Sequence, residues 1–210
     1  MSAWARVRKR VSDAIYQIGP ARYYQPAYAQ IAAAIGIAEG TVLDVGCGPG
    51  WLCMHLAAGR LEIDAVGIDH SPQMVAAARR NKGGRLNITI REMDAAAIKF
   101  PEGTFDAAVT VQSAHHWDEP STIIREVYRV LKPGGRFFIY EADRDSTGVP
   151  EGWIQRRQGW PPDRLVLKGW QRFGMNEEEW ADLQVQARAI PFSNQVHDRH
   201  GFYRRMVLYK

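Results

Sequence analysis

Three glycines at alternate positions, Gly46, Gly48 and Gly50, are the residues of this sequence best suited to hold a ligand. They follow a short apolar segment, residues 41–45, and precede a helix-forming segment that starts at Trp51. Glycine lets the backbone turn sharply and approach a ligand closely. The helix that follows offers free N–H groups and the positive end of its dipole. This strand, glycine loop (residues 46–50) and helix predict a site for a nucleotide-like ligand.

An acidic residue follows the glycine loop at the separation expected of a ribose-binding site. Asp69 ends the next predicted strand, residues 63–68, and lies about 20 positions after Gly50. Its carboxylate can accept hydrogen bonds from two ribose hydroxyls and would repel a 2′-phosphate. Asp69 therefore indicates a ribose, but it would suit a dinucleotide equally well.

The spacing of the glycines distinguishes between these ligands. Dinucleotide-binding proteins have the pattern G-x-G-x-x-G, whereas here Trp51 stands where the third glycine would be. A tryptophan hinders the close approach of a pyrophosphate, and the Asp44 carboxylate would oppose its charge. Asp44 would instead suit a ligand with an ammonium group. An NAD-linked oxidoreductase is therefore disfavoured.

Alternating strands and helices must position these residues. Strands are predicted at residues 41–45, 63–68, 87–91, 105–111 and 136–140, and helices at 51–58, 71–81 and 121–131. Before them, Pro26 can open a helix, and an amphipathic basic helix is expected over residues 4–18. The strands are apolar almost throughout, as in parallel sheets covered on both faces. The pattern predicts an α/β fold with a doubly wound, mostly parallel sheet.

The C-terminal third departs from this alternation. Residues 142–175 contain three of the tryptophans and several prolines, which predicts a small helical cap inserted after the fifth strand. Asn176 and Glu179 form a capping box that begins a helix running to residue 187. Strands at 189–195 and 202–209 then form an antiparallel hairpin and complete a seven-stranded sheet. We expect one domain: N-terminal lid helices at 1–38, a cofactor-binding core at 39–141, the cap, and the last helix and hairpin at 176–210.

Five sequence blocks, in this order and at this spacing, resemble the class I S-adenosylmethionine-dependent methyltransferases. They are Val42–Gly50, Gly67–Met74, Asp94-Ala95, Phe105–Val109 and Arg129–Gly135. The blocks span about residues 41–141, and the resemblance implies a Rossmann-like fold whose last strand is antiparallel. It also implies S-adenosyl-L-methionine as cofactor and S-adenosyl-L-homocysteine as product.

The resemblance implies roles for the residues around the methionine and ribose parts of the cofactor. Gly46, Gly48 and Gly50 would line the methionine moiety, with Cys47 supplying backbone. Asp44 would lie near the cofactor's amino group, and Asp69 would hold the ribose hydroxyls. Gln112, at the end of the fourth strand, would lie beside the methionine part and face the substrate.

A second group of residues would surround the adenine by the same resemblance. His70 and Met74 would flank the adenine or ribose. Asp94 would accept a hydrogen bond from the adenine amino group, and Ala95 would supply a backbone N–H. Tyr23, just before the Rossmann-like unit, would close over the cofactor.

His115 and His116 follow the fourth strand, above the expected position of the methyl group. Either could act as a general base, because imidazole titrates near neutral pH, and His115 is favoured. The alternative is that the pair only begins the next helix and forms the wall of the site. No metal site is expected, because adjacent histidines usually point apart and Cys47 and Cys53 have no further cysteine to complete one.

Composition limits the class of protein further. The 210 residues are 46% hydrophobic and 24% charged, which is ordinary globular usage. No apolar run approaches the ~20 residues that an integral membrane segment needs, and no secretory signal is visible, so a cytoplasmic location is expected. The net charge of +4 permits an anionic partner without requiring nucleic acid.

We expect the acceptor to be a small organic molecule, aromatic or anionic. The cap is too small to form a platform for a macromolecule, and its basic residues outnumber its acidic ones. Val111-Gln112-Ser113-Ala114 stands where enzymes that methylate nucleic acids often carry an Asn-Pro-Pro-Tyr motif, so nucleic acid is disfavoured. The alternatives are an RNA or protein methyltransferase and a non-catalytic S-adenosylmethionine-binding protein. The sequence does not indicate the oligomeric state.

Overall fold

The computed structural model describes residues 23–156 and 161–210 and, within them, leaves out the side chain of Trp170. The predicted basic helix at 4–18 and Trp160 lie outside the described residues. Every described helix is too short or too polar to cross a lipid bilayer.

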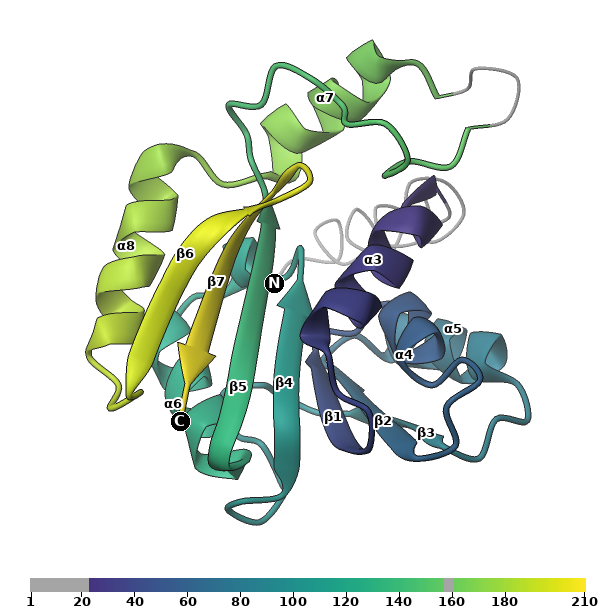
Figure 1. The fold of residues 1–210 in the computed structure, drawn as a ribbon, viewed down its shortest axis with the longest axis vertical. Coiled ribbons are helices and arrows are strands. Elements are labelled where there is room, and N and C mark those ends of the chain that lie inside the picture. The colour runs from purple at the N-terminus through teal and green to yellow at the C-terminus, as the bar shows by residue number, and fades with distance from the viewer. Residues whose placement is uncertain (1–22, 157–160) are drawn as a thin grey trace, which may run out of the picture.

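A seven-stranded sheet with the order β3-β2-β1-β4-β5-β7-β6 forms the centre of the fold (Figure 1). The strands are β1 (Gly40–Val45), β2 (Ile63–Asp69), β3 (Ile88–Glu92), β4 (Phe105–Val111), β5 (Leu131–Ala142), β6 (Asn194–His200) and β7 (Tyr203–Tyr209). Strands β1 to β5 run parallel, whereas β7 is antiparallel to β5 and β6 is antiparallel to β7. This arrangement confirms the predicted Rossmann-like sheet with its closing hairpin.

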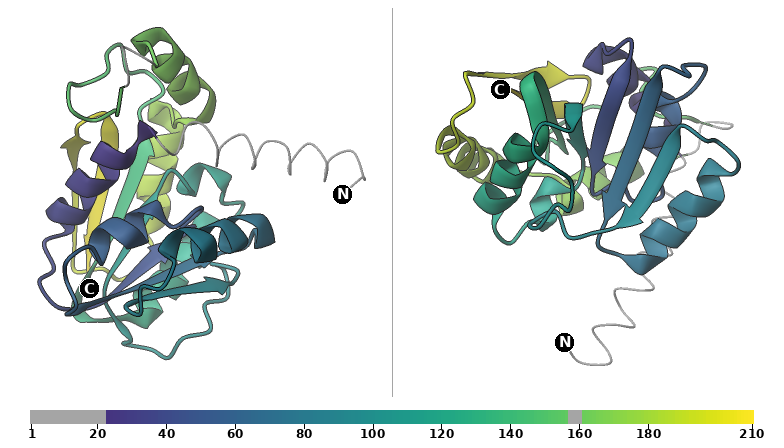
Figure 2. Two further views of the ribbon diagram at one scale, coloured as in Figure 1. Left: turned by 90° about the vertical axis from the view of Figure 1, so that its right-hand side faces the viewer. Right: turned by 90° about the horizontal axis from the view of Figure 1, so that it is seen from below.

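Helices cover both faces of the sheet (Figure 2). They are α3 (Gln25–Ile35), α4 (Trp51–Leu56), α5 (Pro72–Lys82), the 3-10 turn η1 (Ala114–His116), α6 (Pro120–Val130), α7 (Asp163–Phe173) and α8 (Glu177–Arg188). Apolar side chains of α3, α4 and α5 pack on one face, and those of α6 and α8 pack on the other. Helix α7 lies beyond the end of the sheet toward which β4 and β5 point (Figure 1).

Capping residues or a proline begin three of the described helices, α3, α5 and α8. The Ser71 side chain accepts a hydrogen bond from the Met74 N–H at the start of α5. At α8 both bonds of the predicted capping box between Asn176 and Glu179 are present. A proline stands in the first turn of α3, which buries Tyr28, Ile31 and other apolar residues against the sheet. Local capping and apolar spacing therefore agree on where these helices lie.

The sixth strand lies later in the chain than predicted. Helix α8 continues to Arg188, a loop follows, and β6 spans Asn194–His200 instead of residues 189–195. Its sequence, Asn-Gln-Val-His-Asp-Arg-His, is polar because β6 is the edge strand of the sheet. The apolar residues Ile190 and Phe192 suggested a strand, but they belong to the loop and pack against the core beside α6 and α8.

Several other boundaries differ from the prediction by a few residues. Helix α4 ends at Leu56, two residues early, and β5 begins directly after α6 at Leu131. The Lys132–Gly135 segment, which lies between the predicted helix at 121–131 and the predicted strand at 136–140, is an irregular start of β5, where the register with β4 shifts.

The cap joins the sheet through bonds at both of its ends. The Met175 N–H donates to the Ala142 carbonyl (3.0 Å), and the Arg144 N–H donates to the Met175 carbonyl (3.0 Å). Within the cap, the buried Trp153 ring packs edge-on against Phe202 of the hairpin turn. Trp153 therefore belongs to the core between the cap and the hairpin.

Candidate active site

Strand order brings the predicted cofactor residues to one edge of the sheet. Because β3, β2, β1 and β4 are parallel neighbours, their carboxyl ends lie side by side. Along this edge lie Asp94 after β3, Asp69 at the end of β2, the glycine loop after β1 and Gln112 after β4. Ligands of open α/β sheets bind at this edge, where the strand order reverses.

All three glycines of the loop have positive φ angles, of 70° at Gly46, 51° at Gly48 and 78° at Gly50. A β-carbon on Gly46 would lie 2.0 Å from Ser113 Oγ, and one on Gly50 would lie 3.0 Å from the Ala78 β-carbon. A β-carbon on Gly48 would meet no atom of residues 23–156 and 161–210 within 4 Å. Gly46 and Gly50 are therefore required by the protein itself, whereas Gly48 leaves room where a ligand can approach the backbone.

Asp69 fixes the glycine loop as well as offering a ligand contact. Its Oδ2 accepts a hydrogen bond from the Gly48 N–H at 2.9 Å, and its Oδ1 accepts one from the Ser71 N–H at 2.8 Å. Each carboxylate oxygen can accept a second bond, so capacity for ribose hydroxyls remains. Only 8% of Asp69 is exposed, so these bonds are made in a largely water-free setting.

Asp44 is a buried carboxylate beneath the loop. It is 2% exposed, and its Oδ2 accepts a hydrogen bond from the Cys53 thiol at 3.3 Å. Burial raises the pKa of Asp44 from 3.8 to about 7, with the negative charge of Asp69 adding to the rise. No ion pair to Asp44 is formed within residues 23–156 and 161–210. The ammonium group of a ligand would supply the missing positive charge, so this residue fits the cofactor implied by the sequence.

Cys47 is a packing residue of the loop. A β-carbon on Gly67 of β2 would lie 2.8 Å from its Sγ, so the thiol fills the space that this glycine leaves. Burial and the charges of Asp44 and Asp69 raise the pKa of Cys47 well above its usual range. The thiol is therefore protonated at neutral pH and is a poor nucleophile.

The residues expected around the adenine differ in exposure. His70 is 65% exposed at its side chain, and its Nδ1 lies 4.0 Å from Asp69 Oδ1. Met74 is buried at the start of α5. Asp94 is exposed, and its Oδ1 accepts a hydrogen bond from the Ala96 N–H (2.9 Å), which shapes the turn that contains Ala95.

Tyr23 connects the start of the described chain to the cap. Its carbonyl accepts a hydrogen bond from the Gln155 N–H at 2.7 Å. Its side chain is half-buried against the core on the α3 side of the sheet. The contact joins the segment before α3 to the cap, and a cofactor contact by Tyr23 stays a prediction.

Gln112 has a strained backbone. Its φ of 51° is the only positive value among the described non-glycine residues. Such a conformation costs about 1–3 kcal/mol and is often found at functional sites. The Gln112 N–H donates to the Tyr140 carbonyl at 2.8 Å, so β5 holds the chain in this turn as it leaves β4 for η1.

His115, in η1, forms a pair with a residue that the sequence analysis missed. Its Nδ1 lies 2.8 Å from Oε2 of Glu141, the penultimate residue of β5, and this carboxylate is fully buried. The His116 ring lies 3.9 Å from the His115 ring and is more exposed. The sequence signal for Glu141 was a charged residue at the end of an apolar strand, Arg136–Tyr140, at the same edge as the glycine loop. No group of three or more metal-ligating side chains is found among the described residues.

A cavity of about 400 Å³ adjoins this pair. It lies between η1, the start of α6 and the turn from α7 to α8, and its walls include His115, His116, Trp117, Arg172 and Phe173. The wall also includes Arg144 and the carboxylates of Glu179 and Asp182. The cavity therefore has aromatic and charged walls, at the end of β4 where the acceptor is expected.

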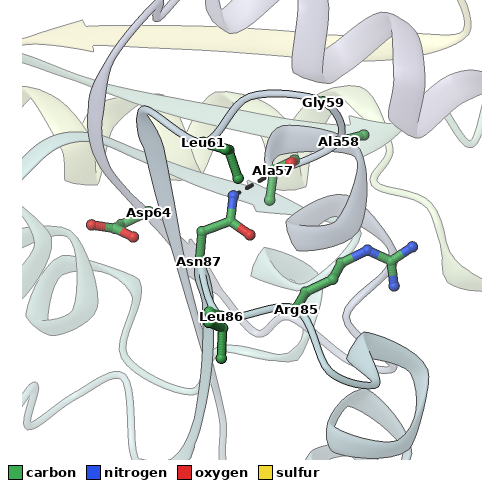
Figure 3. A pocket seen from close by; sticks show the side chains of 8 residues that line it. All are labelled: Ala57, Ala58, Gly59, Leu61, Asp64, Arg85, Leu86 and Asn87. Carbon is green, nitrogen blue, oxygen red and sulfur yellow. Dashed lines mark hydrogen bonds between the residues drawn. The ribbon is translucent and has the colours of Figure 1, made fainter.

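A second cavity, of about 650 Å³, lies at the opposite edge of the sheet (Figure 3). It adjoins the amino ends of β2 and β3, at Asp64 and Asn87. The Asn87 side chain donates hydrogen bonds to the Ala57, Arg60 and Ile63 carbonyls and so holds the turn before β2. The two leucines in its wall, Leu61 and Leu86, are almost fully exposed. None of the predicted site residues line it.

Comparison with known proteins agrees with a ligand site at the carboxyl ends of the parallel strands. Residues 43–139 match the family model described as a methyltransferase domain. The chain is 36% identical over 109 residues to the demethylmenaquinone methyltransferase of Thermus thermophilus, covering 51% of this chain and 50% of the relative. It is 32% identical over 113 residues to the ubiquinone biosynthesis O-methyltransferase of Pseudomonas fluorescens, covering 53% and 48%. The chain thus spans about half the length of these relatives.

Solved structures share the fold over most of the chain. A crystal structure of a SAM-dependent methyltransferase from Aquifex aeolicus has a TM-score of 0.61 at 21% identity, covering 100% of this chain and 98% of that one. Human N-acetylserotonin methyltransferase, solved in complex with SAM, has a TM-score of 0.60 at 17% identity and covers 88% of this chain and 51% of that one. These likenesses support the fold, and the sequence matches support the family. The match of residues 43–139 to a methyltransferase domain therefore agrees with the class I S-adenosylmethionine-dependent methyltransferase family that the sequence resembles.

Proposed function

We propose that this chain transfers a methyl group from S-adenosylmethionine to a small organic acceptor. The observation that carries the proposal is the set of residues at the carboxyl ends of the parallel strands. The buried Asp44 carboxylate has no ion-pair partner among the described residues, and the backbone at Gly48 has no described atom near its β-carbon position. The Asp69 carboxylate, at the end of β2, bonds the Gly48 N–H and can still accept from ribose hydroxyls. Relatives named for demethylmenaquinone and for ubiquinone biosynthesis act on small molecules, which supports an acceptor of the same size.

The chain's own residues would bind and orient the cofactor. Asp44 would pair with its ammonium group, the glycine loop would contact the methionine part through backbone, and Asp69 would accept from the ribose hydroxyls. His70, Met74, Asp94 and Ala95 would surround the adenine, with Tyr23 and Gln112 at the margins of the site. When bound, S-adenosylmethionine supplies an electrophilic methyl group on a sulfonium. Transfer is an in-line displacement, so orientation and exclusion of water can provide much of the rate acceleration.

The acceptor would occupy the cavity beside η1. Trp117 and Phe173 offer aromatic surface to a planar molecule, and Phe173 is 47% exposed despite being apolar. Arg172 is exposed in the same wall and forms no ion pair among the described side chains. Arg144, in contrast, is paired with Glu179 at 3.0 Å. The Arg172 guanidinium lies 5.4 Å from the centre of the Phe173 ring, and the wall also includes the Asp182 carboxylate. A cation beside aromatic surface favours an acceptor that is aromatic and anionic.

Calorimetric titration tests the first step of the proposal. S-adenosylmethionine and S-adenosylhomocysteine should bind at micromolar affinity, and NAD should not bind. Binding without transfer to any acceptor would favour the alternative of a non-catalytic S-adenosylmethionine-binding protein. Absence of binding by both S-adenosyl compounds would refute the proposal. Transfer to RNA or protein in preference to small molecules would refute the acceptor class alone.

A further inference from the structure

Glu141 makes two hydrogen bonds that together define the orientation of His115. Its Oε1 accepts from the Ala114 N–H at 2.6 Å, and its Oε2 lies 2.8 Å from His115 Nδ1. Glu141 is 0% exposed, and the His115 side chain is 13% exposed. Ile139, two residues earlier on β5, packs against α6 and α8, so strand alternation places Glu141 on the same face. The carboxylate thus bonds both the backbone and the side chain of η1.

This arrangement determines the tautomer of the imidazole. A buried carboxylate is an acceptor, so Nδ1 of His115 must carry the hydrogen. The neutral ring then has its lone pair on Nε2, and no hydrogen-bond partner of Nε2 is found within residues 23–156 and 161–210. His115 lines the cavity beside η1, so Nε2 is the ring nitrogen available to a molecule bound there.

The charged groups around the cavity leave this pair intact. Arg144 and Glu179 are occupied with each other, and Asp182 accepts a hydrogen bond from Gln186 at 2.7 Å. Arg172 lies in the wall without a carboxylate partner among the described side chains. The remaining titratable neighbour is His116, whose ring stacks at 3.9 Å. Glu141 is therefore the group that hydrogen-bonds His115, and the other charges face the space beside it.

We propose that Glu141 is a positioning residue that makes His115 a general base, and that the acceptor is a hydroxyl compound. The inference rests on the proposed methyl transfer. As the acceptor oxygen forms its bond to the methyl carbon, its O–H bond breaks and the proton passes to His115 Nε2. The bond from carbon to sulfur breaks with its electron pair moving to sulfur, and His115 later releases the proton to water. A neutral amine needs no such base before attack, so a built base favours a hydroxyl acceptor.

Glu141→Gln is the most informative variant, because it reverses the direction of the hydrogen bond with His115 and keeps the hydrogen bond from the Ala114 N–H. The glutamine oxygen can still accept from the Ala114 N–H, while its NH₂ group would donate to His115 Nδ1. The imidazole hydrogen then moves to Nε2, and the base is lost without a change in shape. Glu126→Gln is the matched control. Glu126 also accepts a backbone N–H, from Ile98 at 3.0 Å, and also bonds a side chain, that of Arg129, but it does not line the cavity.

Nitrogen NMR of the histidine rings reads the tautomer without any acceptor. His115→Ala assigns the signals. In the wild type and in Glu126→Gln at pH 8, we expect an unprotonated Nε2 on His115, and in Glu141→Gln a protonated Nε2. A protonated Nε2 in the wild type, or the same tautomer in both glutamine variants, would overturn the role of Glu141.

Transfer assays with 3,4-dihydroxybenzoate and 4-aminobenzoate test the acceptor class. Both are aromatic carboxylates, and they differ in the acceptor atom. We expect methylation of the hydroxyl compound only, with kcat reduced about 100-fold or more in Glu141→Gln and KM nearly unchanged. Glu126→Gln should match the wild-type kcat. Transfer to the amine, or to neither compound, would overturn the hydroxyl assignment. Calorimetry with S-adenosylmethionine distinguishes a wrong role for Glu141 from a wrong proposed function. Glu141→Gln and the wild type should bind S-adenosylmethionine equally, and absence of binding by the wild type would instead refute the proposed function.

Discussion

Gly46 and Ser113 are in such close contact that a β-carbon on the glycine would lie 2.0 Å from the serine Oγ. The glycine follows β1 and the serine follows β4, so the contact joins the cofactor loop to the segment that carries the histidine pair. Ser113 stands only two residues before His115. The contact gives Gly46 a packing role that the glycine pattern alone did not indicate.

Gly46→Ala should therefore destabilise the protein by more than backbone strain alone. A left-handed backbone costs a non-glycine residue about 1–2 kcal/mol. Gly59→Ala is the control, because Gly59 has a similar φ of 66° but open space around its β-carbon position. Urea unfolding should show a clearly larger loss for Gly46→Ala than for Gly59→Ala. Equal losses would mean that the Ser113 contact relaxes at no cost.

Gly48→Val should remove cofactor binding while leaving the fold largely intact. A β-carbon at this position meets no atom of the described part of the chain within 4 Å, so the main structural cost there is the φ of 51°. The added side chain would occupy the space into which we place the ligand. Calorimetry should detect no S-adenosylmethionine binding, with circular dichroism close to that of the wild type. Tight binding by this variant would contradict the placement of the cofactor.

Asp44→Asn should stabilise the ligand-free protein at high pH while weakening cofactor binding. The folded pKa of about 7 is raised above the unfolded value of 3.8. The stability linked to this group is thus fully present below about pH 4 and is lost as the pH rises to about 7. The asparagine variant lacks this loss, so at pH 8 it should be more stable than the wild type, by up to about 4 kcal/mol.

Urea unfolding of both proteins at pH 5 and pH 8 measures this difference. The advantage of Asp44→Asn should grow with pH, while its affinity for S-adenosylmethionine should be at least tenfold below that of the wild type at pH 8. The reason is that only the ionised carboxylate can pair with an ammonium group. An advantage that does not change with pH would show that Asp44 is ionised in the folded protein at pH 5.

The sequence predicted the parts of the fold that depend on local patterns. The glycine loop, the Ser71 cap and the Asn176–Glu179 capping box are signals within a few residues, and the structure contains all of them. The position of β6 was not predictable in this way, because an edge strand exposes polar side chains and lacks an apolar pattern. Its place is determined by pairing with β7, which is a contact between distant residues.

Glu141 shows the same limit within the candidate active site. Its role depends on Ala114 and His115, which lie 27 and 26 residues earlier in the chain. Its own neighbours in the sequence are the apolar residues of a buried strand and give no sign of a partner. A charged residue at the carboxyl end of a parallel strand was the available signal, and it became interpretable only when the strand order was known.

Asp69→Asn should reduce cofactor affinity by disturbing the loop as well as by removing a ligand contact. The carboxylate accepts from two backbone N–H groups, at Gly48 and Ser71, and an amide has only one oxygen to offer them. Its NH₂ group would face the other N–H, and two donors repel. We expect S-adenosylmethionine affinity to fall about 100-fold or more, as charged hydrogen bonds contribute roughly 1.5–3 kcal/mol each. Asp64→Asn on the same strand is the control, because Asp64 is exposed at the amino edge and should bind cofactor normally. Wild-type affinity in Asp69→Asn, measured by calorimetry beside that control, would mean that the ribose is held elsewhere.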